Sequence, residues 1–277
     1  KVFLTLREAI ATHKGPHPMM EKVVQSLDEK HNISDEDNEE RGDWREDIKD
    51  LPDYMYEKER AAVVYFVGCV ASFFPMVQTI PQHFVRIMDA AHVDFTILGG
   101  AEWCCGFPLI GAGVPERMGE MIEHNLEKVK ALGAKTVVFS CPSCYRTWNE
   151  FYPTDLELLH DTQFLIRMIS DGTIHLGEMN TTVTYHDPCD LGRKSEVYDA
   201  PRSVLTRIPG LTLVEMAETC ENAHCCGGGG NLESHSTDLS SQVAQQRIGQ
   251  AAATGARVLV SACQQCERTL SNAARAS

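Results

Sequence analysis

The sequence lacks an uninterrupted apolar run of the roughly 18 residues that a membrane span needs. It shows no signal-peptide pattern at its start. It has no Gly-x-Gly-x-x-Gly fingerprint after an expected strand, so we expect neither flavin nor NAD in this chain. Positive charge is scarce, and a net charge of −14 argues against nucleic acid and anionic membrane surfaces as partners. We expect a cytoplasmic protein whose membrane association, if any, is made through a partner.

Cysteine, in contrast, is abundant. Ten of the 11 cysteines form two copies of one pattern, with equivalent cysteines 120 to 122 residues apart. Such regular spacing indicates two copies of one folding unit. Cys220 stands outside the pattern and is interpreted as a bystander thiol. The first copy is Cys69, Cys104, Cys105, Cys141 and Cys144, and the second is Cys189, Cys225, Cys226, Cys263 and Cys266.

Strand-like and helix-like segments alternate from residue 61 onward. We expect an N-terminal helical extension with an acidic linker (1–60), followed by two pseudo-symmetric Rossmann-like halves with parallel sheets (61–175 and 176–277). Each cysteine group follows the C-terminal end of a strand, the edge where open α/β sheets bind ligands. The expected strands are 61–67, 95–98, 136–139, 156–159, 181–185, 211–215 and 258–260, and the expected helices are 2–12, 17–30, 81–92, 115–132, 162–170, 202–208 and 237–254.

The acidic part of the extension holds nine acidic residues between Asp35 and Asp50. We interpret it as a solvated linker that lies on a surface or on a partner.

Five cysteines per copy suit an iron–sulfur cluster better than zinc. Zinc takes four tetrahedral ligands, so the fifth thiolate would be surplus. Adjacent cysteines diverge from a single ion, but each can reach a different iron of a cluster. Gly106, Gly227 and Gly228 are expected to let a cluster approach the backbone, whose NH groups then bond sulfur. A zinc-stabilised scaffold without a redox role remains the alternative from another class.

The repeated Cys…Cys-Cys-Gly…Cys-x-x-Cys arrangement resembles the cysteine-rich CCG domain family, whose best-known member is the disulfide-reducing subunit of heterodisulfide reductase. The phrases Tyr185-His-Asp-Pro-Cys-Asp-Leu-Gly-Arg193 and Cys141-Pro-Ser-Cys144 carry the resemblance, which covers residues 61–277. It implies two [4Fe–4S] clusters of a non-cubane type, one on each cysteine set, and cleavage of a small disulfide between them. Two departures from the family pattern, Asp190 and Gln264, remove no ligand.

The resemblance also implies partners. Residues 1–60 resemble the segment that follows a ferredoxin-like module in fused members, and we expect ferredoxin-like iron–sulfur and flavin subunits to supply electrons. In the alternative, the chain is an electron-relay subunit of a flavin-dependent dehydrogenase for lactate, glycolate or succinate, without a substrate site of its own.

Proton donors and substrate contacts are the least determined part of the site. His186, Asp187 and His224 lie beside cluster cysteines and are the expected catalytic residues, with loop-stabilising hydrogen bonds as the alternative. Arg193, with Lys194, is the expected contact for an anionic substrate.

Overall fold

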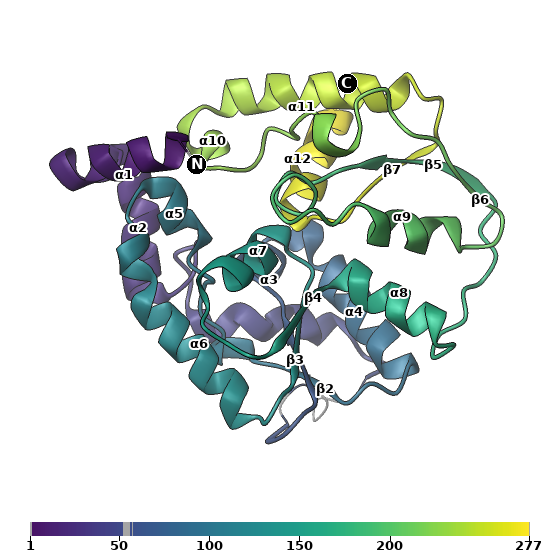
Figure 1. Cartoon of the computed structure of the whole chain (residues 1–277), viewed down its shortest axis with the longest axis horizontal. Coiled ribbons are helices and arrows are strands. Elements are labelled where there is room, and N and C mark those ends of the chain that lie inside the picture. Colours follow the sequence, from purple (N-terminus) through teal and green to yellow (C-terminus); the bar gives the residue numbers. More distant parts are fainter. Residues whose placement is uncertain (1, 52–55, 57, 277) are drawn as a thin grey trace.

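The computed structural model describes residues 2–51, 56 and 58–276. Its described strands form two parallel sheets, which confirms the α/β prediction with two Rossmann-like halves (Figure 1). The first sheet has the order β2-β1-β3-β4, and the second has the order β6-β5-β7. The strands are β1 (Val63–Phe66), β2 (Phe95–Ile97), β3 (Thr136–Phe139), β4 (Glu157–His160), β5 (Thr181–His186), β6 (Leu211–Leu213) and β7 (Val258–Ser261).

The two sheets share one topology. Strand β5 lies between β6 and β7, as β1 lies between β2 and β3, and every pairing is parallel. The first sheet carries β4 in addition, paired with β3. The duplicated cysteine pattern therefore corresponds to a duplicated arrangement of strands.

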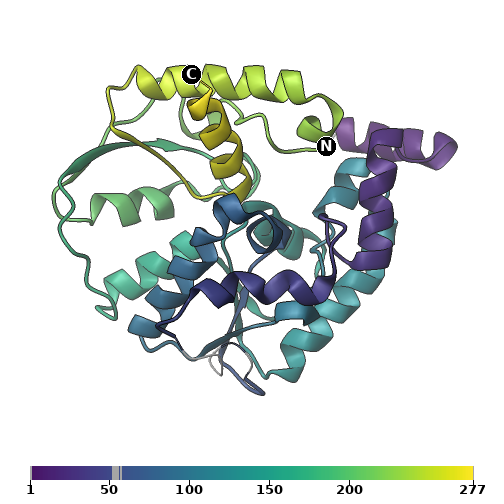
Figure 2. The same ribbon diagram turned by 180° about the vertical axis from the view of Figure 1, so that it is seen from behind.

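Helices surround both sheets (Figures 1 and 2). Among the described residues, no helix is long and apolar enough to cross a membrane. The α-helices are α1 (Val2–Lys14), α2 (Pro18–Lys30), α3 (Cys69–Phe73), α4 (Thr79–Ala90), α5 (Phe107–Ala112), α6 (Gly119–Ala131), α7 (Pro142–Phe151), α8 (Asp161–Ser170), α9 (Asp199–Thr206), α10 (Leu232–His235), α11 (Thr237–Ala252) and α12 (Gln264–Arg275). Short 3₁₀ helices are η1 (Asn38–Asp47), η3 (Pro75–Val77), η4 (Gly99–Ala101), η5 (Pro115–Met118) and η6 (Cys220–Asn222).

The central strand β1 is buried on both faces, as expected for a parallel sheet covered by helices. Val64 and Phe66 point into one core, which also contains the first cysteine set and apolar residues of α2, α5, α6 and α7. Val63 and Tyr65 point into the opposite core, with residues of α4 and α8. The first cysteine set therefore lies at the edge of the larger hydrophobic core.

The Cys-x-x-Cys segments lie at the starts of helices. Cys141 and Cys263 are the N-caps of α7 and α12, two helices that the sequence analysis missed. The Cys263 sulfur accepts the backbone N–H of Cys266 at 3.4 Å. The second cysteine of each motif thus lies in the first helical turn, where free N–H groups favour negative charge such as a thiolate.

The acidic segment combines exposed and buried side chains. All nine acidic side chains between Asp35 and Asp50 are exposed, as the solvated interpretation requires. However, the segment forms η1, whose Arg41 and Trp44 are buried in the body of the protein. The segment therefore lies on the surface of the protein, anchored there by two large side chains, while its acidic side chains face solvent.

Candidate iron–sulfur site

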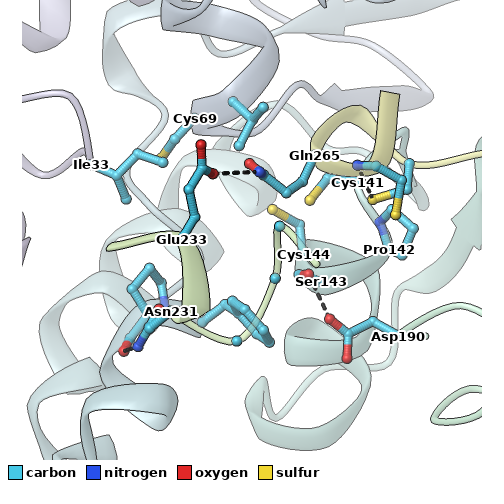
Figure 3. A pocket seen from close by; sticks show the side chains of 18 of the residues that line it. Ile33, Cys69, Cys141, Pro142, Ser143, Cys144, Asp190, Asn231, Glu233 and Gln265 are labelled. Atoms are coloured by element: carbon cyan, nitrogen blue, oxygen red, sulfur yellow. Dashed lines mark hydrogen bonds between the residues drawn. The ribbon is translucent and has the colours of Figure 1, made fainter. Parts of the chain in front are cut away.

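One cavity brings the two cysteine copies together. It has a volume of about 230 Å³ and lies between the two sheets' cysteine-bearing edges (Figure 3). Residues from α2, from the α3 region and from the glycine run complete its wall. Nine of the ten patterned cysteines line it: Cys69, Cys104, Cys105, Cys141, Cys144, Cys189, Cys226, Cys263 and Cys266.

Within each copy the five thiols form one chain of sulfur–sulfur hydrogen bonds, and the order is the same in both. The first chain runs Cys69–Cys104–Cys105–Cys144–Cys141. The second runs Cys189–Cys225–Cys226–Cys266–Cys263. None of the ten is in a disulfide. Each set therefore converges on one centre, as ligands of a single cluster must.

The pKa values of these thiols reflect their crowding. Hydrogen bonds from Cys104 and Cys144 lower the pKa of Cys105 to about 6. The hydrogen bond to Cys225 raises the pKa of Cys226 to about 12, and burial adds to the increase. The hydrogen bond to Cys104 and burial also raise the pKa of Cys69. Five buried thiolates would repel one another and lack solvation. They can all be deprotonated only if a positive charge, such as iron, binds them.

Glycines supply N–H donors to the cysteine sulfurs, and their role in holding a cluster stays a prediction. Gly227 N donates to Cys225 Sγ at 3.3 Å, and Gly228 N donates to Cys226 Sγ at 3.4 Å. Gly106 N bonds Cys104. Sequence reasoning missed Gly68, which has a φ of 82° and where a Cβ would lie 3.2 Å from the Cys144 sulfur.

Replacing Gly227 with alanine should destabilise the fold by about 1–3 kcal/mol, the usual scale of such backbone strain. Gly227 has a φ of 87°, and a Cβ there would lie 2.5 Å from the Ser240 carbonyl oxygen. Gly229→Ala is the matched control, since a Cβ at Gly229 would meet nothing within 4 Å. The check is denaturant unfolding of both variants, and equal midpoints would contradict this assignment.

His186 lies against the second cysteine set. Arg247 Nε donates to His186 Nδ1 at 3.0 Å, and a guanidinium can only donate, so the neutral ring carries its proton on Nε2. Burial and Arg247 lower the pKa of His186 to about 4. A ring nitrogen of His186 and the sulfurs of Cys226 and Cys266 lie within 4.8 Å of one another, and Nε2 is buried without a partner. His186 is thus placed as an N–H donor beside the sulfurs rather than as an acid at neutral pH.

Asp187 is held in a tight network. Its carboxylate receives two hydrogen bonds from Arg202, at 2.7 and 2.9 Å, and one from the Cys220 N–H at 2.9 Å. Despite partial burial, these donors lower the pKa of Asp187. Asp187 therefore stays ionised and stabilises the loop that carries Cys220, the alternative that the sequence left open.

His224 and Arg193 lie outside the shared cavity. They line a second cavity of about 350 Å³, together with Cys225, which is the exposed member of its set. His224 bonds the Gln250 side chain, and Arg193 donates to the Ala223 carbonyl oxygen. The catalytic and substrate-binding roles of His186, Asp187, His224 and Arg193 stay predictions, and only His186 faces the buried sulfurs.

The two departures from the family pattern, Gln264 and Asp190, make contacts between the two halves of the chain. Gln264 is fully buried; it donates to the Val67 carbonyl oxygen at 2.9 Å and accepts the Ala71 N–H at 3.2 Å. Asp190 accepts a hydrogen bond from Ser143 at 2.7 Å (Figure 3) and another from Arg146 at 3.0 Å. Both residues belong to the second half and contact the first, so they fix the cysteine sets on opposite sides of the cavity.

The rest of the cavity wall is largely apolar, apart from Ser143 with Asp190 and a polar corner around Glu233. Ile33, Phe74 and Phe107 contribute apolar surface. At the polar corner, Glu233 pairs with Arg268 and accepts a hydrogen bond from Gln265 at 3.0 Å (Figure 3). Gly230 of the glycine run lines the cavity and is exposed. Such a site suits a small ligand that carries both apolar and polar parts.

Comparison with known proteins finds one family pattern twice in the chain. The sequence pattern of the cysteine-rich (CCG) domain matches residues 63–148 and again residues 183–271. The chain is 36% identical over 266 residues to a subunit of the dihydromethanophenazine:CoB–CoM heterodisulfide reductase from Methanosarcina mazei, a match that covers 92% of this chain and 63% of the relative.

Two further relatives carry different names. A probable iron–sulfur-binding oxidoreductase, FadF, from Bacillus subtilis is 29% identical over 92% of this chain and 38% of its own length. EtfAB:quinone oxidoreductase from Syntrophomonas wolfei is 32% identical over 69% of this chain and 27% of its own length. The chain thus spans less than two thirds of the length of these relatives.

Proposed function

Because the chain belongs to the cysteine-rich CCG domain family, we propose that it is an iron–sulfur oxidoreductase subunit, like that of heterodisulfide reductase, which reduces or forms a disulfide. The observation that carries the proposal is the single cavity lined by nine cysteines of two equivalent sets. A disulfide placed there would have one set on each side.

Each cysteine set fits one [4Fe–4S] cluster, and the family resemblance favours the non-cubane type. The sulfurs converge, glycine N–H groups donate to them, and a ring nitrogen of His186 lies within 4.8 Å of two sulfurs of the second set. The clusters would supply electrons one at a time, so two of them match the pair that a disulfide requires. We propose that a partner subunit carrying iron–sulfur or flavin groups provides these electrons.

The protein's own residues would bind the ligand and exclude water from the reacting sulfurs. Disulfide reduction consumes two electrons and two protons and releases two thiols. Apolar residues such as Phe74 and Phe107 would keep water from the sulfurs, while Arg268 and Gln265 orient the polar part of the ligand. Since His186 is neutral and Asp187 is ionised, protons would arrive from solvent.

The second candidate is an electron-relay subunit with no substrate of its own. It is favoured by the similarity to EtfAB:quinone oxidoreductase and by the exposure of Cys225, which would let electrons cross the second set to a partner. In that case the shared cavity would serve only to exclude water from the two clusters.

Disulfide turnover separates the two candidates. With a reduced one-electron dye as donor, the anaerobically purified protein should oxidise two dye molecules for each small disulfide added, and Cys220→Ser should behave like the wild type. A protein that holds iron but oxidises dye only when a quinone or partner acceptor is added would instead support the relay.

A further inference from the structure

Arg41, a residue of the N-terminal segment, places a positive charge next to the first cysteine set. It lies in η1, outside both copies of the cysteine domain, yet its side chain is only 1% exposed. Its Nη2 donates to the Cys69 sulfur at 3.3 Å, and its guanidinium lies 5.2 Å from the Phe73 ring centroid. Burying a guanidinium is costly unless it is paired, so Arg41 needs a buried partner of opposite charge.

Glu102 is the partner that makes this burial possible. Arg41 Nη1 contacts Glu102 Oε1 at 2.8 Å, and both side chains are 1% exposed. The same carboxylate accepts the backbone N–H groups of Val67 at 2.9 Å and Gly68 at 2.8 Å. The pair therefore fixes both the loop that precedes Cys69 and the guanidinium that donates to its sulfur.

The second set has a different environment. In the described contacts no arginine donates to a sulfur of that set. Arg247 donates to the His186 ring instead. The repeat offset places Phe66 where the second half has His186, so this donor has no counterpart in the first half. Cys225 is exposed, whereas its equivalent Cys104 is 3% exposed.

We propose that Arg41 makes the two clusters unequal, by raising the reduction potential of the cluster on the first set above that of the cluster on the second. This inference rests on the proposed function. Reduction adds negative charge to a cluster and its thiolates, and a charge-assisted N–H···S bond stabilises the reduced form more than the oxidised form. Electrons that arrive beside the exposed Cys225 would then move inward to the first set.

The test is a redox titration of the anaerobically purified protein, followed by electron paramagnetic resonance. Arg41→Gln should lower the equilibrium constant for reducing one cluster about tenfold, which is about 59 mV for a one-electron couple. The other cluster should be unchanged. Cys266→Ser, which should retain only the first cluster, identifies which signal shifts.

Two further variants separate electrostatics from structure. Arg41→Lys keeps the charge without the paired geometry, so its shift should have the same sign and be smaller. Arg86→Gln is the control: it also removes one paired arginine from the first half, but Arg86 pairs with Asp50 and donates to no cysteine in the described contacts, so neither cluster should shift.

Iron content distinguishes failure of the proposed function from failure of the role proposed for Arg41. A wild-type protein without iron would refute the proposed function itself. Full iron in Arg41→Gln with unchanged potentials, or with equal shifts of both clusters, would overturn only the role of Arg41. If Arg41→Gln loses the first cluster, the Arg41→Lys titration decides, and an unshifted first cluster in that variant would overturn the proposal.

Discussion

Serine in place of Cys226 removes about half of the bound iron and lowers disulfide turnover by roughly a hundredfold or more, since even outer-shell changes at metal sites cost up to that factor. The Cys226 side chain is buried and lies in the middle of the second sulfur chain, between Cys225 and Cys266. Its loss should release the second cluster and leave the first. One remaining cluster cannot deliver an electron pair across the cavity.

Cys220→Ser is the control for this result. Cys220 is a free cysteine a few residues upstream, outside both sulfur chains, and its backbone N–H is bonded to Asp187. Iron content and turnover should both match the wild type. Equal iron loss in the two serine variants, or undiminished turnover with half the iron, would contradict the assignment of Cys226 as a ligand of a required cluster.

Alanine in place of Glu102 costs about 3–5 kcal/mol of unfolding free energy, as expected when one partner of a buried ion pair is removed. The change leaves the Arg41 charge and the backbone N–H groups of Val67 and Gly68 without their acceptor. Glu150→Ala is the matched control, because Glu150 is 42% exposed and its pairing with Arg146 should contribute less than about 1 kcal/mol. Denaturant unfolding gives both values, and similar midpoints would contradict the buried-pair assignment.

The sequence predicted the parts of the fold that repeat. All seven strands of the described residues and both cysteine sets could be found because hydrophobic runs and cysteine spacing are local signals, and every strand except β4 has a counterpart in the other half. Helices α7 and α12 were missed because each begins at a cysteine whose spacing was interpreted only as a metal-ligand pattern. Their apolar positions, Tyr145 and Trp148 in α7 and Leu270 and Ala273 in α12, carried a helical spacing that could have revealed them.

Long-range partners could not be predicted in the same way. Arg41 stands in a run of exposed acidic residues, and only the folded chain brings it to Cys69, 28 positions away. The contacts of Gln264 and Asp190 also join segments that are far apart in sequence. Their unusual residue types were visible in the sequence, but their role in joining the two halves depends on tertiary packing.

The proposed function requires that two equivalent cysteine sets each hold one cluster beside a common cavity. The most direct test is to measure iron and acid-labile sulfide per chain in the anaerobically purified protein. Two [4Fe–4S] clusters predict about eight of each. About four of each would mean that one set is empty, and zinc without sulfide would mean a structural metal protein; either result would contradict this arrangement.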